Sequence, residues 1–560
     1  MGRPQNRQII ILLIAAALLI GAAFWFRPSS PLIAVVPHHD LVKTERAELL
    51  NLLSRRARPK TILLLSPNHF DAGNGMITTS DQSWIIEGGA KKIEPDRRIV
   101  GALKESGATA VSPSAFDNEH GIRNILGDIA KSFPRALLVP IIIKADAGAE
   151  QVQKLHDTLS ALCGTDCGVL ASVDMSHYQP EVIAQTHDVK TLRALGALDE
   201  KQVWQAETDS PAALYFLMLW AKSRRAEHFN LFAHTNSGTI ARNPDIETTT
   251  HIFGYYTKGP VAAINENICT FTFAGDSMFG RGIGARFQKN GFRDLFFNLG
   301  DRVFRGTDIS WINLEGPISD HEVVQDLRPD NVNFNFSAAA AGAISYLKIN
   351  AAGLANNHTI NQGQDGLGTT RTLLENKGVT AVGDPNVVSH EWTTSCAGKQ
   401  IALIAINTFA DYSNATRLII EKKTEGNFVI VVPHWGAEYQ EKHSPHQEAL
   451  AKEWVAAGAG LILGAHPHVI QDAQVIDGTP VFYSLGNFIF DQQFSEKTQR
   501  GLLIAGSLDD KKIKMSIVPI KSVNLKPELL RGKEKKQIID KLCSGLPEYC
   551  TAAGLEIRLK

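Results

Sequence analysis

Short apolar runs that end abruptly on an acidic, amide or imidazole residue recur through the second half of this chain, and they constrain its fold strongly. The runs have the length and the Val/Ile/Leu-rich character of buried strands, and amphipathic stretches such as His446 to Gly458 separate some of them. Buried strands that alternate with helices form a largely parallel sheet with helices on both faces. The sequence therefore predicts an α/β fold.

The same alternation runs through the first half of the chain and closes at Thr250 to Tyr256. A turn-rich segment, TKGPVAAINEN, follows, and a second strand series begins at Cys269. Because single hydrophobic cores stop growing at roughly 250 to 300 residues, a chain of 560 residues is expected to contain two domains. We place α/β domains at residues 30–262 and 267–525, and a lysine-rich helical extension at residues 526–560.

Polar strand ends in the second domain point to a metal site, since the reactive groups of open α/β sheets lie at the carboxyl ends of the strands. Six such places follow apolar runs: Gly275-Asp276, Asn313-Leu314-Glu315, Asn356-Asn357-His358, His434, His466-Pro467-His468 and Ser484-Leu485-Gly486-Asn487. Carboxylate, amide and imidazole groups from separate strands can converge on one or two divalent ions, and these donors suit Mn, Fe, Zn or Mg. Taken singly, each residue would also be explained as a helix cap or as a partner of a buried backbone group.

The order of the motifs GD, NLE, ANNH, PHWG, GAHPH and SLGNF over residues 269–508 resembles the CapA family of poly-γ-glutamate capsule biosynthesis proteins. This family is part of the calcineurin-like metallophosphoesterase superfamily, so the resemblance implies a metallophosphoesterase-type sandwich. It also implies metal ligands, which are Asp276 and His468 for one ion, Asn357, His434 and His466 for the other, and Glu315 in place of the bridging aspartate. His358 would be the catalytic residue, an acid or electrostatic partner beside the scissile group.

The chain departs from the superfamily at the first motif, which is Asp-X-His in other members. Here Asp276 is followed by Ser277 and Met278, so one ligand of a full two-metal site is missing. A thioether is a poor ligand for hard or borderline divalent ions, and a mononuclear or lopsided site is therefore the alternative. Glu438 and His443, in WGAEYQEKH, could line the pocket or belong to a solvated loop.

The strand ends of the first domain resemble the Memo-like family, also called AmmeMemoRadiSam system protein B, over about residues 31–258. That family is related in fold to class III extradiol dioxygenases of the LigB type. The pocket residues implied by the resemblance are His38, His69, His120, Asp174 and His177. They could hold a non-haem iron or a similar ion. Ala241 stands where family members often carry a cysteine ligand, so a pocket without a tightly bound metal is the alternative.

The uncharged run from Ile9 to Phe26 predicts one membrane helix. A helix of this length is about 27 Å long, close to the ~30 Å hydrocarbon core of a bilayer. Arg3 and Arg7 precede the run and favour an N-in orientation. Residues 1–29 would then be a cytoplasmic stub and anchor, and the protein would be a single-pass protein of the cell membrane with both domains extracytoplasmic. A removed signal peptide is the alternative.

Six cysteines suit an oxidising compartment. Two local disulfides are expected from their spacing, Cys163 with Cys167 and Cys543 with Cys550, which leaves Cys269 and Cys396 over. No pair of CxxC motifs is present, so a structural zinc site is not expected.

The composition is that of an ordinary globular protein, with 44% apolar and 21% charged residues and a formal net charge of −1. This balance argues against a nucleic-acid partner. Two functions remain. The first is an anchored metallohydrolase that acts on an envelope polymer or a phosphoester. The second is a non-catalytic assembly factor that binds a polymer such as polyglutamate during export, with the Memo-like domain as a metal- or ligand-binding module.

Overall fold

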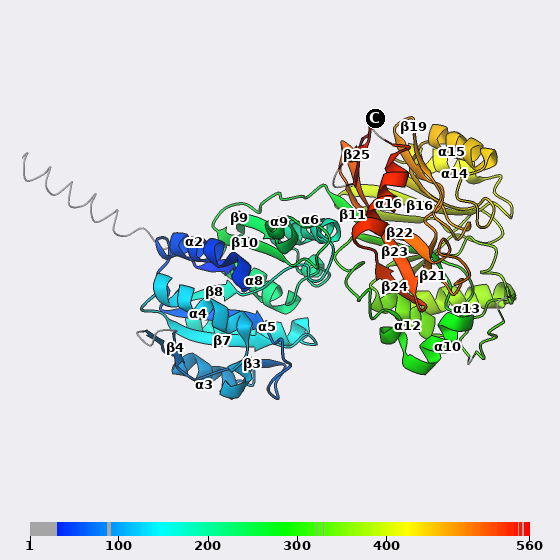
Figure 1. The fold of residues 1–560 in the computed structure, drawn as a ribbon. Coiled ribbons are helices and arrows are strands. Elements are labelled where there is room, and N and C mark those ends of the chain that lie inside the picture. Colours follow the sequence, from blue (N-terminus) through cyan, green and yellow to red (C-terminus); the bar gives the residue numbers. More distant parts are fainter. Residues whose placement is uncertain are drawn as a thin grey trace, which may run out of the picture. The chain divides into compact units, whose positions relative to one another are not determined.

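The computed structural model describes residues 31–86, 91–321, 323–328, 330–546, 548–551 and 554–559. These residues form mixed α/β structure and divide into two compact units (Figure 1). The first unit holds the described residues up to Val173 together with Ala212–Ala233 and Ile252–Ala262. The second holds Asp174–Pro211, His234–His251 and the described residues from Ala263 onward.

The membrane helix in the predicted fold class, and the single-pass location that depended on it, need correction. Within the described part of the chain, no helix is both long enough and apolar enough to cross a bilayer. The predicted helix at residues 9–26 lies outside the described residues. It was expected because an uncharged apolar run of this length, flanked by arginines, matches the thickness of a bilayer.

The sheet of the first unit combines a parallel centre with antiparallel neighbours, for example β1 parallel to β8 and antiparallel to β10. Its strands in spatial order are β6 (Ala110–Val111), β3 (Ile77–Thr79), β7 (Leu137–Ile143), β2 (Thr61–Pro67), β8 (Cys167–Ala171), β1 (Ile33–Val35), β10 (Thr250–Thr257) and β9 (His228–Asn236). Helices α2 (Lys43–Ser54) and α4 (His120–Ser132) bury leucine and isoleucine side chains against β2 and β7. All seven residues of β2 are buried, as its apolar run Ile62–Leu65 predicts.

The second unit contains two large sheets. The ten-stranded sheet runs β14 (Thr380–Val382), β13 (Ala351–Gly353), β12 (Ile309–Leu314), β11 (Cys269–Ser277), β22 (Arg500–Leu508), β23 (Lys512–Val523), β26 (Gly554–Arg558) and β25 (Cys550–Thr551), with β21 (Asn487–Ile489) beside β11 and β24 (Lys526–Leu529) beside β23. The six-stranded sheet runs β15 (Trp392–Cys396), β16 (Lys399–Asn407), β17 (Phe428–His434), β18 (Ala459–Leu463), β20 (Thr479–Phe482) and β19 (Ala473–Ile476).

One apolar cluster joins the two sheets into a sandwich. It contains Phe273 and Trp311 from the larger sheet and Leu403, Ile430 and Leu461 from the smaller one. Helices α10 (Arg281–Asn290), α12 (Ala339–Tyr346) and α13 (Gly363–Glu375) contribute to a second cluster with the larger sheet, and α14 (Ala415–Thr424) and α15 (Pro445–Ala457) to a third with the smaller sheet. Figure 1 shows these two groups of helices on opposite sides of the sandwich.

All six cysteines form disulfides. The two local pairs expected from the sequence, Cys163–Cys167 and Cys543–Cys550, are present. Cys269 and Cys396, which were expected to remain unpaired, instead form a disulfide across 127 positions. Their disulfide connects the start of β11 to the end of β15 and so links the two sheets.

Helix α6 (Glu181–Ala197) belongs to the second unit although it precedes the predicted domain boundary by about 70 residues. It packs on β11 and β22, and its Lys190 and Arg193 are buried beside Asp308. The compact units therefore do not coincide with residues 30–262 and 267–525, and those boundaries stay a prediction. Residues 526–560, expected as a helical extension, include α16 (Gly532–Cys543) and also strands that extend the larger sheet.

Candidate metal centre

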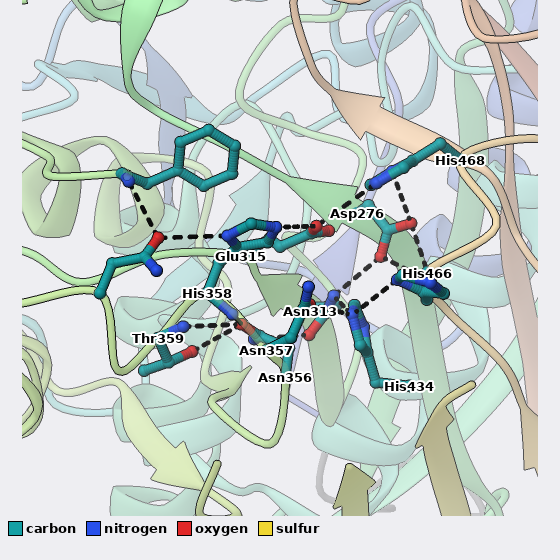
Figure 2. A network of polar contacts seen from close by, with 12 residues as sticks. Asp276, Asn313, Glu315, Asn356, Asn357, His358, Thr359, His434, His466 and His468 are labelled. Atoms are coloured by element: carbon teal, nitrogen blue, oxygen red, sulfur yellow. Dashed lines mark hydrogen bonds and ion pairs between the residues drawn. The ribbon is translucent and has the colours of Figure 1, made fainter. Parts of the chain in front are cut away.

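The predicted ligands of the second unit lie where its parallel strands end. Strand β11 pairs in parallel with β12, and β12 with β13, while β17 pairs in parallel with β16 and β18. Parallel strands direct their carboxyl ends to one edge of a sheet. Asp276, Glu315, Asn357, His434, His466 and His468 come from these ends, and Figure 2 shows their side chains converging.

Asp276 contacts three neighbours through its buried carboxylate. Oδ1 accepts a hydrogen bond from Asn313 Nδ2 at 2.8 Å, and Oδ2 accepts one from the backbone N–H of His466 at 3.1 Å. His468 Nδ1 lies 3.3 Å from Oδ2. Asp276 thus connects β11 with the His466–His468 turn, in which both histidines have a positive φ.

His434 stands between an amide and a second imidazole. Its Nε2 lies 2.8 Å from Asn357 Oδ1 and 3.1 Å from His466 Nδ1. Burial, with His466 close by, holds the pKa of His434 well below its ordinary value. Burial likewise lowers the pKa of His466 to about 4. Both rings are therefore neutral near pH 7, which is the form that binds metal ions.

Glu315 is the most informative side chain of the site. It is 0% exposed, and neither carboxylate oxygen has a hydrogen-bond partner in the described part of the chain. Two imidazole nitrogens lie near it, His468 Nε2 at 3.4 Å and His358 Nε2 at 3.9 Å. Burial raises the pKa of Glu315 to about 8. A buried carboxylate without hydrogen bonds is costly, so this position fits a divalent cation.

Charges within the site separate His468 from the other two histidines. Burial alone would lower its pKa, but Glu315 and Asp276 outweigh that effect and raise the pKa of His468 to about 9. Asn487 Oδ1 lies 3.0 Å from His468 Nδ1 and positions the ring.

His358 lies beside Glu315 with one ring nitrogen occupied. Its Nδ1 is 3.1 Å from Asn361 Oδ1, and that oxygen also accepts a hydrogen bond from the backbone N–H of Phe334. Because an amide oxygen can only accept, Nδ1 carries a proton and Nε2 is the nitrogen that faces Glu315. Burial lowers the pKa of His358. A pocket of about 330 Å³ opens on His358, Glu315, His468, Glu438 and Arg281.

The structure brings all six predicted ligands and His358 together, and how the ligands divide between ions stays a prediction. Asn356, beside Asn357, has a structural role, since its Oδ1 accepts from the backbone N–H groups of His358 and Thr359. Sequence reasoning named Asn313 and Asn487 in their motifs but gave them no role. In the structure, Asn313 hydrogen-bonds to Asp276 and Asn487 hydrogen-bonds to His468. Their positions at strand ends could have indicated these roles.

The first unit has a second cluster, formed by the predicted residues His38, His69 and His120. Their ring centroids are 3.9 to 5.3 Å apart, and one nitrogen of each lies within 4.8 Å of the others. The buried Glu119 holds His69, with Oε1 2.6 Å from Nδ1 and Oε2 accepting from the backbone N–H at 2.9 Å. Although burial opposes it, the hydrogen bond to His69 lowers the pKa of Glu119.

The other two predicted pocket residues, Asp174 and His177, belong to the second unit. Asp174 Oδ1 lies 3.3 Å from His251 Nδ1, and His177 Nε2 lies 3.9 Å from Asp209 Oδ2. Burial raises the pKa of Asp209 well above its ordinary value, and Asp174 adds to this effect. Sequence reasoning missed Asp209 and His251. His251 lies near the start of the buried strand β10 and not at its carboxyl end, so the strand-end pattern gave no sign of it.

Comparison with known proteins finds a family match for each part of the chain. Residues 270–492 match the family described as Bacterial capsule synthesis protein PGA_cap, and residues 24–247 match the family described as Memo-like protein. The two resemblances expected from the sequence are thereby confirmed.

Relatives of each part are known by name. The PGA biosynthesis protein CapA of Bacillus subtilis is 26% identical over 269 residues, which cover 43% of this chain and 69% of the relative. The capsule biosynthesis protein CapA of Bacillus anthracis is 28% identical over 280 residues, or 46% of this chain and 68% of the relative. A MEMO1 family protein of Caldivirga maquilingensis is 22% identical over 217 residues, or 36% of this chain and 76% of the relative.

Proposed function

Because the chain carries a Memo-like domain followed by a PGA_cap domain, we propose that it is a capsule-biosynthesis protein whose PGA_cap domain is a metal-dependent hydrolase. The bond attacked would be an amide or a phosphoester of an envelope polymer. The capsule context is supported by the relatives named CapA. The observation that carries the proposal is Glu315, whose buried carboxylate has no hydrogen-bond partner among the described residues and lies close to aspartate and histidine side chains.

The donor set fits one or two divalent ions such as Mn, Fe, Zn or Mg. Asp276 and Glu315 supply oxygens, Asn357 an amide oxygen, and His434, His466 and His468 nitrogens. When bound there, the ions would supply Lewis-acid chemistry that withdraws electron density from the group under attack. The residues around them keep the ligands in place, as Asn313 does for Asp276.

His358 is the residue proposed to move a proton. Its Nδ1 is committed to Asn361, so Nε2 exchanges protons with a group in the pocket. The pocket has the size of a small-ligand site, and Phe334, Phe490 and Tyr439 form part of its wall. These rings would exclude water from one side of the bound polymer segment, while His358 and Glu315 face it.

The proposal is tested by a hydrolysis screen with the purified full chain, stripped with a chelator and reloaded with Mn²⁺ or Zn²⁺. Substrates are p-nitrophenyl phosphate, a phosphodiester analogue, a γ-glutamyl anilide and poly-γ-glutamate. We expect turnover of at least one substrate class that chelation removes. The absence of metal-dependent turnover for all four would contradict the proposal.

His358→Ala separates chemistry from binding in the same assay. The variant should keep its metal content and slow hydrolysis by ~10² to 10⁴, as loss of a general acid or base does. His321→Ala is the matched control, because His321 is an exposed histidine that lies beside the exposed Asp320. Loss of metal from His358→Ala would contradict the role proposed for this residue.

A second candidate function is a non-catalytic polymer-binding or export factor, in which the Memo-like domain is a metal- or ligand-binding module. Met278 favours it, since it replaces a histidine of the superfamily and its buried sulfur accepts from Gly280 N at 2.9 Å. This function predicts that poly-γ-glutamate binds without turnover and that His358→Ala binds it equally well.

A further inference from the structure

The side of the metal centre that lacks its usual histidine has a carboxylate available from another loop. Met278 is 0% exposed and packs into the apolar cluster beneath α10 and α12, so it offers the site nothing. Glu438, four residues beyond the end of β17, is exposed and lines the same 330 Å³ pocket as Glu315 and His468.

The loop that carries Glu438 is fixed against the His466–His468 turn. The backbone N–H of Tyr439 donates a hydrogen bond to Pro467 O at 2.8 Å, between the two histidines. Gln492 Nε2 donates to the Tyr439 hydroxyl at 3.2 Å, and the Tyr439 ring lies 6.3 Å from the His468 ring. Gly436 and Tyr439 both adopt a positive φ, which gives the loop a defined bend. A non-glycine residue adopts such a φ at a cost, so the surrounding contacts fix the loop.

Glu438, His466 and His468 form a group whose ligand atoms all lie within 4.8 Å of one another. A second such group, Asp276, Glu315 and His434, shares no member with it. The two groups adjoin, since His468 Nε2 is 3.4 Å from Glu315 Oε1. Two adjoining groups of three potential ligands fit a site for two metal ions. The first motif, which lacks its histidine, would not indicate such a site by itself.

The orientation of His468 supports this grouping. Asn487 Nδ2 donates to Thr498 O at 2.9 Å, which leaves Asn487 Oδ1 as the acceptor facing His468 Nδ1 at 3.0 Å. His468 therefore holds a proton at Nδ1, and Nε2, which faces Glu315, is the nitrogen that would bind an ion after losing its proton.

We propose that Glu438 is a metal ligand, which with His466 and His468 forms the outer metal position of the centre in place of the histidine that Met278 replaces. One carboxylate and two imidazoles suit Mn, Fe or Zn and leave coordination positions open toward the pocket. The inference rests on the proposed metal centre but not on any reaction there.

The test is the Mn²⁺ content of the full chain after equilibrium dialysis, together with the electron paramagnetic resonance spectrum of the bound Mn²⁺. Glu438→Gln keeps the shape of the side chain but removes the charge and most of its ligand strength. We expect it to lose one equivalent of Mn²⁺, or to bind that equivalent at least ~10-fold more weakly, since even outer-shell changes cost that much. The spectrum should change from that of a coupled pair to that of an isolated ion.

Glu441→Gln is the matched control. Glu441 lies on the same loop but pairs with Lys497 and Lys541, so its variant should retain the wild-type Mn²⁺ content and spectrum. Glu438→Ala must reproduce the loss seen with Glu438→Gln. Wild-type Mn²⁺ content and spectrum in both Glu438 variants would overturn this inference alone. Failure of the wild-type chain to bind any Mn²⁺ would overturn the proposed metal centre with it.

Discussion

The carboxylates of the two histidine clusters do different things. In the PGA_cap domain, Glu315 is buried beside the histidines with no hydrogen-bond partner in the described residues. In the Memo-like domain, Glu119 accepts from His69 Nδ1, from His69 N and from Gly121 N. The first carboxylate has no described hydrogen bond to stabilise its charge, which would suit a bound cation, whereas the second orients a histidine and caps α4.

This difference implies different metal preferences. Carboxylate and amide oxygens suit Mg and Mn, and imidazole suits Zn, Cu and Fe. The PGA_cap cluster combines oxygens with imidazoles, so Mn²⁺ should bind there. The described residues of the first unit bring together three imidazoles, His38, His69 and His120, and a cluster of this kind should favour Zn²⁺ or Fe²⁺ over Mn²⁺. Since the clusters lie in separate compact units, we expect a substitution in one cluster to leave metal binding by the other unchanged.

His434→Ala should remove most bound metal from the PGA_cap cluster alone, and it has the largest expected effect of the variants. His434 contacts both Asn357 and His466, so its removal opens the middle of the PGA_cap cluster. We expect most bound Mn²⁺ to be lost, with an affinity decrease beyond the ~10- to 100-fold that an outer-shell change costs. Metal analysis after dialysis gives the result.

The reciprocal variant is the control for His434→Ala. His69→Ala should lose Zn²⁺ from the first unit and keep Mn²⁺ in the second. If His434→Ala instead retained its full metal content, the ligands of the PGA_cap cluster would have to be sought among other residues.

Asp308→Asn should destabilise the second unit and leave the first unit unchanged, and it has the next largest expected effect. Asp308 is the partner of Lys190 and Arg193, which are both buried. Breaking a buried ion pair from one side costs about 3 to 5 kcal/mol. We expect an earlier unfolding transition for the second unit in denaturant, while Zn²⁺ binding by the first unit is unchanged.

The pH dependence of the second unit supplies an additional check. Burial opposes ionisation of Asp308, but Lys190 and Arg193 outweigh it and lower its pKa. The stabilisation by Asp308 is therefore present above the unfolded-state pKa near ~4 and is lost as the pH falls through the lower folded pKa.

Asp540→Asn is the control for Asp308→Asn. It removes an exposed pair with Lys536 and should lower the free energy of unfolding by less than about 1 kcal/mol. Equal unfolding curves for the two variants would mean that α6 is not held by Asp308.

The strand-end motifs predicted much of the site because parallel topology leaves little freedom. Once ISWI and FVIVVP are buried parallel strands, Glu315 and His434 must emerge at carboxyl ends. The structure has strands there, and it has helix α15 where the amphipathic stretch ending at Gly458 predicted one.

Contacts between distant segments could not be predicted in this way. Periodicity describes local structure, whereas the Cys269–Cys396 disulfide depends on how two sheets pack. The same limit applies to α6, whose Lys190 and Arg193 would look like a solvated helix face without Asp308 in view. The sequence could not decide whether Glu438 lines the pocket or lies in a solvated loop. Its position depends on the hydrogen bond from Tyr439 N to Pro467 O, which joins two loops that are separate in sequence.

Glu119→Gln is the smallest change and the most specific test of the comparison. If Glu119 orients His69 for metal binding, loss of its charge should weaken Zn²⁺ binding in the first unit by ~10- to 100-fold, as for other carboxylate–histidine pairs at metal sites. A Zn²⁺ titration against a competing chelator measures this change, and Mn²⁺ binding by the second unit should stay constant. Glu94→Gln, at an exposed pair with Lys92, is the control in the same unit. If Glu119→Gln lowered the unfolding midpoint but left Zn²⁺ affinity unchanged, Glu119 would be only the cap of α4, and the three histidines would need no charged partner.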